Sequence, residues 1–364
     1  MKKNKLIILT ASLAAATLLS ACGKDKKAPT TTEALTTTAS IEIIPESDMN
    51  NAGNIELEEK KEGFVRSEFS GEWIDESLEK QRPLCIMINN IGEAMPQSGI
   101  SQADITYEML VEGGITRYMC VFKDYSNLTK LGPVRSARHY YVRLASMLDG
   151  LYGHVGWSAY AEEEIANRGV NNLNGLTALS NIMYYRDNSR KAPHNVYTDS
   201  EKIVAGIDYD GYRKEYNAED SKMFAFNKED TPLQSQMAAN KVTTAFNSSR
   251  KPWFEYNSQD GLYYRFQYGD KQIDDQTGNQ LTYKNVIIMF VQYTDLFEGL
   301  LDVDFNKGGT GFYITDGEYV PITWANDNGV VKYFGADGNQ LKMNPGKTFI
   351  TVFNENLPDG ITIE

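Results

Sequence analysis

Short apolar segments in the first half of the chain predict buried strands. Residues 82–90 have the sequence RPLCIMINN, an apolar run bounded by Pro and by two Asn residues, which is typical of a buried strand. Residues 117–122 (RYMCVF) are almost continuously apolar, as in a strand covered on both faces. Residues 151–157 (LYGHVGW) predict a further strand. Residues 104–112 (DITYEMLVE) fit both a helical period and a strand, so the pattern leaves that segment open.

Helical periods follow these strands. Ser136 stands where it can cap a helix that runs to Leu148. Five apolar residues of that helix share one face at about 100° per residue, and we expect this face to be core; they are Ala137, Tyr141, Leu144, Ala145 and Leu148. Ser158 is expected to cap a second helix, and Thr198 or Asp199 a third that ends near Gly206. Alternating strands and helices favour crossover connections and a layered α/β sheet.

From about residue 242 the pattern changes to short runs rich in Tyr, Phe, Val and Ile. Asp-Gly and Asn-Gly turn signals separate these runs, and such turns between alternating segments predict hairpins. Residues 285–291 (NVIIMFV) are expected to form a central strand, and Trp324 to lie in the core. The pattern therefore predicts the α+β class, with a layered α/β sandwich domain at residues 71–215 followed by a β-rich domain at residues 240–356.

The first residues have the order of a secretory signal. A basic start with Lys2, Lys3 and Lys5 precedes an apolar stretch at residues 6–19, which is shorter than a membrane-spanning helix requires. The tetrapeptide LSAC that ends at Cys22 resembles a bacterial lipobox, and this resemblance implies cleavage before Cys22 and a lipid on its thiol. We therefore predict a signal peptide at residues 1–21 and an extracytoplasmic protein anchored to the cell membrane by the lipid on Cys22. Residues 22–70 are rich in Thr, Glu, Lys, Ser and Asn, which predicts a disordered tether.

Composition excludes several classes of function. The formal charge of the 364 residues is −13, which argues against nucleic acid as a partner. No metal site is predicted, because the three histidines lie in separate segments and no two Cys residues are closely spaced. Residues 302–306 begin like a calcium loop, but Lys307 and Tyr313 stand where Gly and Glu are required. Neither a P-loop nor a dinucleotide fingerprint is present, so no cofactor is expected. Cys85 and Cys120 lie inside apolar runs and are expected to be buried free thiols.

The candidate site lies in residues 113–141. Arg135, His139 and Arg143 fall opposite the apolar face of the first helix, with Arg138 on its flank. Guanidinium groups and an imidazole beside the unpaired N–H groups of a helix start suit an anion. Arg117 and His194 complete the set of anion-binding candidates. Asp104 and Glu108 are candidate acids or bases. As an alternative to a ligand site, the arginines could equally form salt bridges with Asp104, Glu108, Glu112 or the acidic face of the next helix. Ser158 is a helix cap rather than a nucleophile, because Tyr160 replaces the second Gly of a nucleophile elbow.

Several short motifs resemble one known family. They include RP at Arg82, PQSG at Pro96, EGGITR at Glu112, GPVRSAR at Gly132 and PHNVYT at Pro193. These motifs resemble the YerB-like lipoprotein family, which is of unknown function. The resemblance covers nearly all of the chain after about residue 70. The resemblance implies an α/β N-terminal domain and a β-rich C-terminal domain. The chain departs from the pattern at Met95, where the family would have Arg.

Three hypotheses for function remain. The first is a non-catalytic binding or accessory lipoprotein of the cell envelope, which holds an anionic ligand or a protein partner at the arginines. The second is an envelope enzyme acting on a phosphate-bearing wall or lipid-linked glycopolymer precursor, with Arg117, Arg135 and Arg138 as a phosphate clamp. This second hypothesis is motivated by a faint similarity to wall-polymer ligases of the LytR type, which is carried by the short motifs AD, TR and PVRSAR in that order. In the third, the arginines form buried salt bridges that join the two halves.

Overall fold

One large sheet combines strands from both halves of the chain. The computed structural model describes residues 61–217 and 223–364, and all of them lie in one compact unit. The sheet has eleven strands in the order β20-β19-β18-β16-β22-β4-β5-β3-β6-β7, with β17 paired to β16 beside this path. The first half contributes β3 (Leu84–Asn90), β4 (Ile105–Leu110), β5 (Thr116–Phe122), β6 (Leu151–His154) and β7 (Asn172–Asn174). The second half contributes β16 (Asn285–Asp295), β17 (Leu301–Asp304), β18 (Gly309–Thr315), β19 (Glu318–Asp327), β20 (Val330–Phe334) and β22 (Thr348–Asn354).

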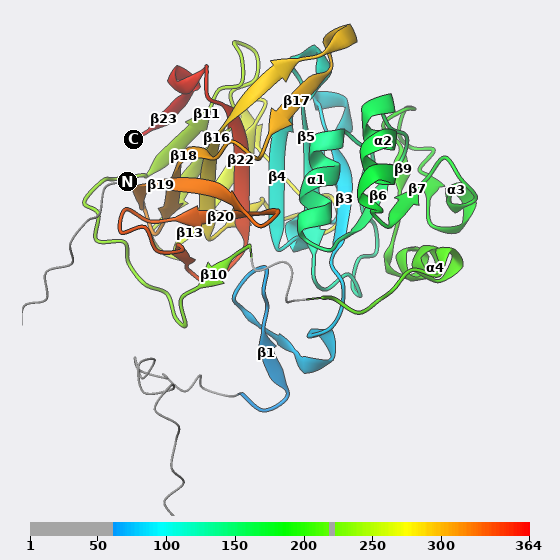
Figure 1. Ribbon diagram of the computed structural model, residues 1–364, viewed down its shortest axis with the longest axis horizontal. Helices are drawn as coiled ribbons and strands as arrows, with labels where there is room; N and C mark the ends of the chain where they lie inside the picture. Colours follow the sequence, from blue (N-terminus) through cyan, green and yellow to red (C-terminus); the bar gives the residue numbers. More distant parts are fainter. Residues whose placement is uncertain (1–60, 218–222) are drawn as a thin grey trace, which may run out of the picture. The chain divides into compact units, whose positions relative to one another are not determined.

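The two halves join at β22. This strand lies between β16 and β4 and runs parallel to both, with Thr348 opposite Ile105 and Thr351 opposite Glu108 (Figure 1). The α+β class is therefore observed, but the β-rich half extends the sheet of the α/β half instead of forming a sheet apart from it.

A second sheet of six strands comes from the second half alone. Its order is β14-β13-β12-β11-β23, with β15 paired to β13. The strands are β11 (Lys241–Thr244), β12 (Trp253–Asn257), β13 (Leu262–Gln267), β14 (Asp270–Lys271), β15 (Thr282–Tyr283) and β23 (Ile361–Ile363). Three strand pairs stand apart from both sheets: β1 (Phe64–Arg66) with β2 (Trp73–Asp75), β8 (Tyr185–Arg186) with β9 (Val196–Tyr197), and β10 (Ala225–Phe226) with β21 (Lys342–Met343).

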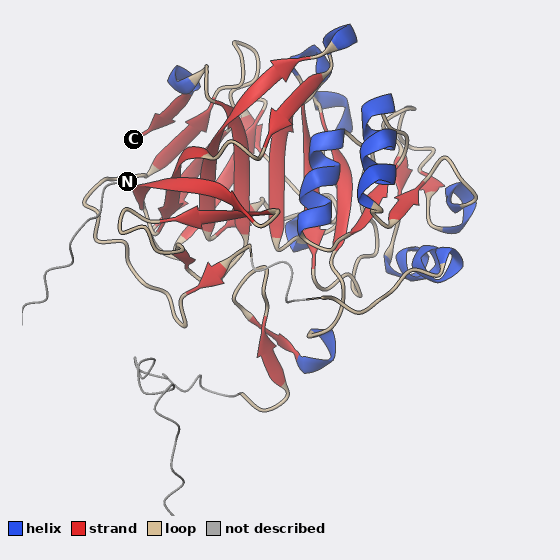
Figure 2. Ribbon diagram, viewed as in Figure 1, coloured by secondary structure: helices blue, strands red, loops and turns tan. Residues whose placement is uncertain are grey.

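Four α-helices accompany the sheets in the described ranges: α1 (His139–Met147), α2 (Ala159–Arg168), α3 (Leu179–Ile182) and α4 (Ser200–Asp210). Short 3-10 helices are η2 (Glu76–Leu78), η3 (Gly92–Ala94), η4 (Ile100–Gln102), η5 (Glu112–Gly114), η7 (Phe297–Gly299) and η8 (Pro358–Gly360). Figure 2 shows α1 and α2 side by side over the strands of the first half.

The large sheet is buried on both faces, so it separates two apolar cores. Met87, Met109 and Met119 pack with Tyr141 and Leu144 of α1 on one face. On the other face Ile86 and Tyr118 pack with Phe254 and Tyr263 of the second sheet, and with residues of α3 and α4. Every residue of β3 and β5 is buried, which explains their almost continuous apolar sequences.

Most of the predicted elements are confirmed. Strands occur at β3, β5, β6 and β16, and the segment left open is strand β4. Ser158 caps α2 by accepting a hydrogen bond from the Ala161 N–H at 3.3 Å. Trp324 is buried in the core, and Cys85 and Cys120 are buried free thiols.

The start of the first helix was predicted wrongly. Ser136 does not cap it, because α1 begins at His139 and the extended residue Arg138 precedes it without a side-chain cap. Residues 135–137 form strand-like hydrogen bonds instead: Arg135 N–H donates to Met87 O at 2.9 Å, and Ala137 N–H to Gly156 O at 2.9 Å. The Ser136 hydroxyl donates to Val155 O at 3.1 Å. The backbone groups that would have begun the helix are therefore used by neighbouring strands.

Two further boundaries differ from expectation. Helix α4 continues past Gly206 to Asp210, and the residue that follows it, Gly211, adopts the left-handed conformation that favours glycine (φ 66°). Gly206 lies inside the helix, where a Cβ atom would come within 2.9 Å of Met183. Residues 61–70, assigned from the sequence to the end of the tether, belong to the folded part, since β1 pairs with β2 and Phe69 is buried. Cys22 and the predicted signal peptide lie outside the described residues.

Candidate functional site

Two of the predicted arginines meet at one carboxylate, that of Glu112. Arg138 donates to both carboxylate oxygens, from Nε to Oε2 at 2.8 Å and from Nη2 to Oε1. Arg117 Nη2 donates to Oε1 at 3.2 Å. Such a bidentate arrangement is the strong form of an Arg–carboxylate pair. The pairing of the arginines with Glu112, which the sequence had left as an alternative, is thus present in the structure.

The β4–β5 hairpin brings Glu112 to this position. Its turn, η5, contains Gly113 and Gly114 at φ values of 72° and 67°, which side chains rarely tolerate. The Val111 N–H donates to Ile115 O at 2.8 Å and closes the turn. Arg117 lies opposite Met109 on β4, so its side chain emerges on the face of the sheet that carries α1. The local backbone therefore places Glu112 over Arg117 and beside the start of α1.

Charges dominate the ionisation of this cluster. Burial alone would raise the pKa of Glu112, but the hydrogen bond from Arg138 and the charges of Arg117 and Arg138 lower it to about 2. Burial, and then the charge of Arg138, lowers the pKa of Arg117 to about 10. Glu112 and Arg117 are therefore both charged at neutral pH. The Nε atom of Arg117 is buried and has no hydrogen-bond partner in the structure.

Arg135 and His194 lie at the side of the cluster. Arg135 is partly buried, its Nη1 makes a long hydrogen bond of 3.5 Å to Pro193 O, and its buried Nε has no partner. Burial lowers the pKa of Arg135, and the charge of Arg138 lowers it further. The His194 ring shares a hydrogen bond of 2.7 Å with the Asn89 amide. Burial, and then the charge of Arg135, lowers the pKa of His194. We call Arg117, Arg135, Arg138, His194 and Glu112 the arginine cluster.

His139 is directed elsewhere. Its Nε2 lies 2.9 Å from Asp302 Oδ1 of β17, and Arg143 Nη1 donates to the same oxygen at 2.7 Å. Arg143 Nε also donates to Glu164 of α2 at 3.3 Å. We expected the side of α1 that carries His139 to be opposite the core, but His139 is only 3% exposed because β17 covers it. No local sequence signal pointed to Asp302 as its partner.

The two candidate acids lie away from the arginine cluster. Glu108 is fully buried on the opposite face of the sheet, where its Oε2 accepts a hydrogen bond of 2.6 Å from Arg265. Asp104 precedes β4 at the far end of the strand from Glu112, and its Oδ2 accepts a 2.7 Å hydrogen bond from Lys123 N–H. Burial raises the pKa of Asp104 to about 6. The structure therefore separates both candidate acids from Arg117 and Arg138.

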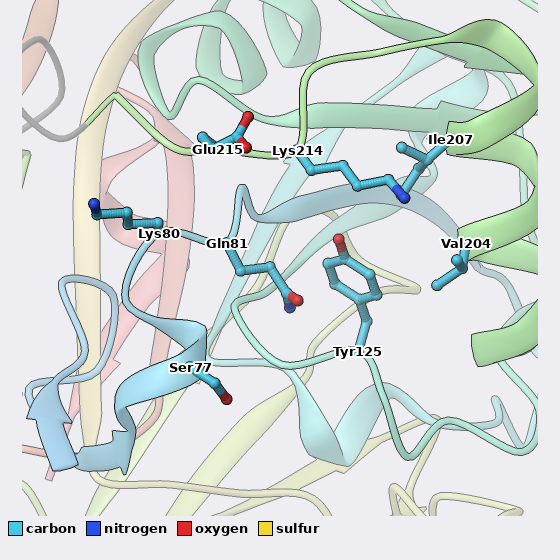
Figure 3. Close-up of a pocket in the computed structure, with 8 residues that line it drawn as sticks. All are labelled: Ser77, Lys80, Gln81, Tyr125, Val204, Ile207, Lys214 and Glu215. Carbon is cyan, nitrogen blue, oxygen red and sulfur yellow. The ribbon is translucent and has the colours of Figure 1, made fainter. Parts of the chain in front are cut away.

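A pocket of about 360 Å³ occurs at another place in the fold. Figure 3 shows Tyr125 in its wall between Gln81 and Val204. Burial raises the pKa of Tyr125 to about 12, so its hydroxyl stays protonated. The remaining lining residues are Ser77, Lys80, Ile207, Lys214 and Glu215. This pocket contains none of the site residues predicted from the sequence.

Two kinds of feature are absent from residues 61–217 and 223–364. No group of three or more His, Cys, Asp or Glu side chains in these ranges is arranged to hold a metal ion. No helix within the same ranges has the length and hydrophobicity needed to cross a membrane.

Comparisons with known proteins agree on one family. The N-terminal domain of a protein family of unknown function, DUF3048, matches residues 69–213, and its C-terminal domain matches residues 242–350. A Bacillus subtilis (strain 168) protein named "Putative lipoprotein YerB" is 29% identical over 298 residues, which are 79% of this chain and 86% of that protein. The crystal structure of YerB from Bacillus subtilis has a TM-score of 0.74 and 27% identity, and the match covers 82% of this chain and 99% of that chain.

Proposed function

The chain belongs to the two-domain YerB-like family of unknown function, and from this premise we propose that it is an extracytoplasmic lipoprotein that binds an anionic ligand of the cell envelope. In this proposal residues 1–21 are a signal peptide, Cys22 carries the lipid, and the following residues connect it to domains at about 71–215 and 240–356. Two acyl chains on one residue are enough for a stable anchor, because each buried CH₂ contributes about 0.8 kcal/mol. The name of the Bacillus subtilis relative supports the lipid anchor.

The observation that carries the binding role is the charge excess of the arginine cluster. Two guanidinium groups contact one carboxylate, and Arg135, beside them, has no carboxylate partner among the described residues. The buried Nε atoms of Arg117 and Arg135 also lack acceptors. Buried donors without partners are costly, so a ligand that supplies oxygen acceptors would be stabilised there. Because the chain as a whole is acidic, this local excess of positive charge favours a specific anion site over general attraction.

A catalytic role is less well supported by this geometry. The enzyme hypothesis required Asp104 or Glu108 to act as acid or base beside the arginines. Glu108 is buried on the opposite face of the sheet, and Asp104 lies at the other end of β4. Glu112, the carboxylate that does reach the arginines, has a pKa of about 2 and is a poor proton donor at neutral pH.

Phosphate binding to the full-length protein in detergent tests the anion site. Wild type is compared by calorimetry with Arg135→Ala, because Arg135 can be removed without leaving a carboxylate unpaired. We expect Arg135→Ala to weaken binding about tenfold, the loss of one charge-assisted contact. Arg168→Ala on α2 is the matched control and should bind like wild type. Equal affinity of the Arg135→Ala variant and wild type would contradict the proposed site.

Fatty-acid labelling in cells tests the anchor separately. The wild-type chain is expected to incorporate a radioactive fatty acid and to remain in the membrane fraction, and Cys22→Ala to lose both properties. Label that persists in the Cys22→Ala chain would overturn the predicted lipidation.

A further inference from the structure

The pocket of about 360 Å³ lies between two segments of the first half of the chain. One segment, residues 77–81, begins in η2, and the other, residues 204–215, contains the second half of α4 and the residues that follow it. The two segments are joined where Arg82 N–H donates to Lys214 O at 2.9 Å. Backbone hydrogen bonding therefore fixes both walls of the pocket relative to each other.

The Tyr125 hydroxyl is a buried donor in this pocket that has no partner. Tyr125 is only 5% exposed, and no group in the described part of the chain forms a hydrogen bond with its hydroxyl. Figure 3 shows the hydroxyl directed into the pocket, on the side of Lys214. A buried polar group without a partner is costly, so a ligand oxygen that accepts this hydrogen bond would be stabilised in the pocket.

Lysine side chains give the pocket an excess of positive charge. Lys214 Nζ forms an ion pair with Asp208, but both side chains are 54% exposed. Exposed pairs contribute little to stability, so Lys214 can exchange Asp208 for an anionic ligand at small cost. The second lining lysine, Lys80, has no acidic partner among the described residues, and Glu215 is the one acid among the described lining residues.

Val204 and Ile207 give the same pocket an apolar wall. They are three residues apart on α4, so they are neighbours on one face of the helix. Ile207 is buried, whereas Val204 is 43% exposed and leaves apolar surface open to a ligand. Small-molecule sites typically combine such apolar surface with a few polar groups that orient the ligand.

We propose that this pocket binds a small carboxylate with an apolar body. The carboxylate accepts hydrogen bonds from the Tyr125 hydroxyl and from Lys214 Nζ, and the apolar body packs against Val204 and Ile207. A carboxylate fits better than a phosphate, because arginine, the residue best suited to phosphate, does not occur among the described lining residues. This site goes beyond the proposed function, since it shares no residue with the arginine cluster.

An NMR titration on the full-length protein in detergent tests the site with isocaproate, which has a carboxylate and a branched apolar body. Acetate has only the carboxylate, and isopentanol only the apolar body. We expect isocaproate to bind about tenfold more tightly than either probe, because it uses both parts of the pocket. Tyr125→Phe removes the hydroxyl and keeps the ring, and it should weaken isocaproate binding about tenfold. Its melting temperature should equal or exceed that of wild type, because the hydroxyl has no partner to lose.

Tyr209→Phe is the matched control, because Tyr209 is an exposed tyrosine of α4 outside the pocket. It should bind isocaproate like wild type, and so should Arg135→Ala. Partition of the probes into detergent is the same for every variant, so differences between variants report on the protein. If Tyr125→Phe binds isocaproate as tightly as wild type, if acetate binds as tightly as isocaproate, or if wild type binds no probe, the pocket proposal is wrong. If Arg135→Ala alone loses isocaproate, the carboxylate binds at the arginine cluster and the pocket proposal again fails, while the proposed function stands.

Discussion

Arg265 of β13 donates a 2.6 Å hydrogen bond to Glu108 of β4, and both side chains are completely buried between the two sheets. The Arg265 guanidinium lies 4.5 Å from the ring centres of both Phe254 and Phe349. Glu108 Oε1 accepts further hydrogen bonds from Asn90 and Thr116. A salt bridge that joins the two halves is therefore present, as one hypothesis predicted, but its arginine is not one of those selected from the sequence.

Removing one member of this pair should destabilise the whole fold. Arg265→Met leaves a buried carboxylate without its counter-charge, which costs about 3–5 kcal/mol. Replacing both residues, Arg265→Met with Glu108→Gln, should recover part of that loss because no buried charge remains. Urea unfolding at pH 7 measures both free energies. A double variant as unstable as Arg265→Met would show that packing, rather than the unpaired charge, is responsible.

An exposed ion pair provides the control. Lys332 and Asp327 form a 2.7 Å contact at the surface, and Lys332→Ala should change the free energy of unfolding by less than about 1 kcal/mol.

Glu112→Gln should separate binding from stability. The substitution removes the charge that Arg117 and Arg138 contact, so we expect stability at pH 7 to fall by about 1–2 kcal/mol, with allowance for partial exposure. Phosphate affinity should rise at the same time, because the internal competitor for the guanidinium groups is neutral. Calorimetry and thermal unfolding on the same samples measure both effects.

At acidic pH, the difference in stability between the Glu112→Gln variant and wild type should disappear. The folded pKa of Glu112 is lowered to about 2, so its contribution is complete above the unfolded value of 4.5 and is lost as the pH falls toward 2. Glu163→Gln, on the exposed side of α2, should change neither property. A Glu112→Gln variant that binds phosphate more weakly than wild type would mean that Glu112 assists the ligand.

Local sequence patterns predicted the strands that are buried on both faces but not their order. Residues 82–90, 117–122 and 285–291 are recognisable because nearly every position is apolar. The insertion of β22 between β16 and β4 depends on contacts between residues more than 240 positions apart, such as Thr348 with Ile105. Hydrophobic periodicity describes only neighbouring residues, so it could not reveal that both halves share one sheet.

The same limit applied to the site. Short motifs identified the arginines and Glu112, which are close in sequence as well as in space. The partners of His139 and Glu108 are Asp302 and Arg265, each about 160 residues away. Glu108 was selected as a candidate acid because nothing local indicates that β4 is covered by a second sheet carrying a buried arginine.

Asp302→Asn should loosen the contact between α1 and β17. The Asp302 carboxylate accepts hydrogen bonds from both His139 and Arg143, and losing its charge should cost about 1–2 kcal/mol at pH 7. The pKa of Asp302 is lowered to about 2: burial opposes this shift, but the hydrogen bond from His139 and the charge of Arg143 outweigh it. The difference between variant and wild type in urea unfolding should therefore disappear as the pH falls from 4 toward 2. The exposed Asp295→Asn substitution is the control, and an equal loss in both variants would argue against a specific role for Asp302.

Asp104→Asn should change how stability depends on pH. Burial raises the pKa of Asp104 from 3.8 to about 6, so between these values the folded state binds more protons than the unfolded state. Wild-type stability should fall through this window as the pH rises, by roughly 2 kcal/mol after allowance for partial exposure. Asn remains neutral and can still accept the hydrogen bond from Lys123 N–H. Urea unfolding measures the free energy of unfolding of both proteins. The value for the variant minus the value for wild type should be about 2 kcal/mol larger at pH 7.5 than at pH 4. A constant difference between the two proteins across this range would show that Asp104 is ionised in the folded state already at pH 4.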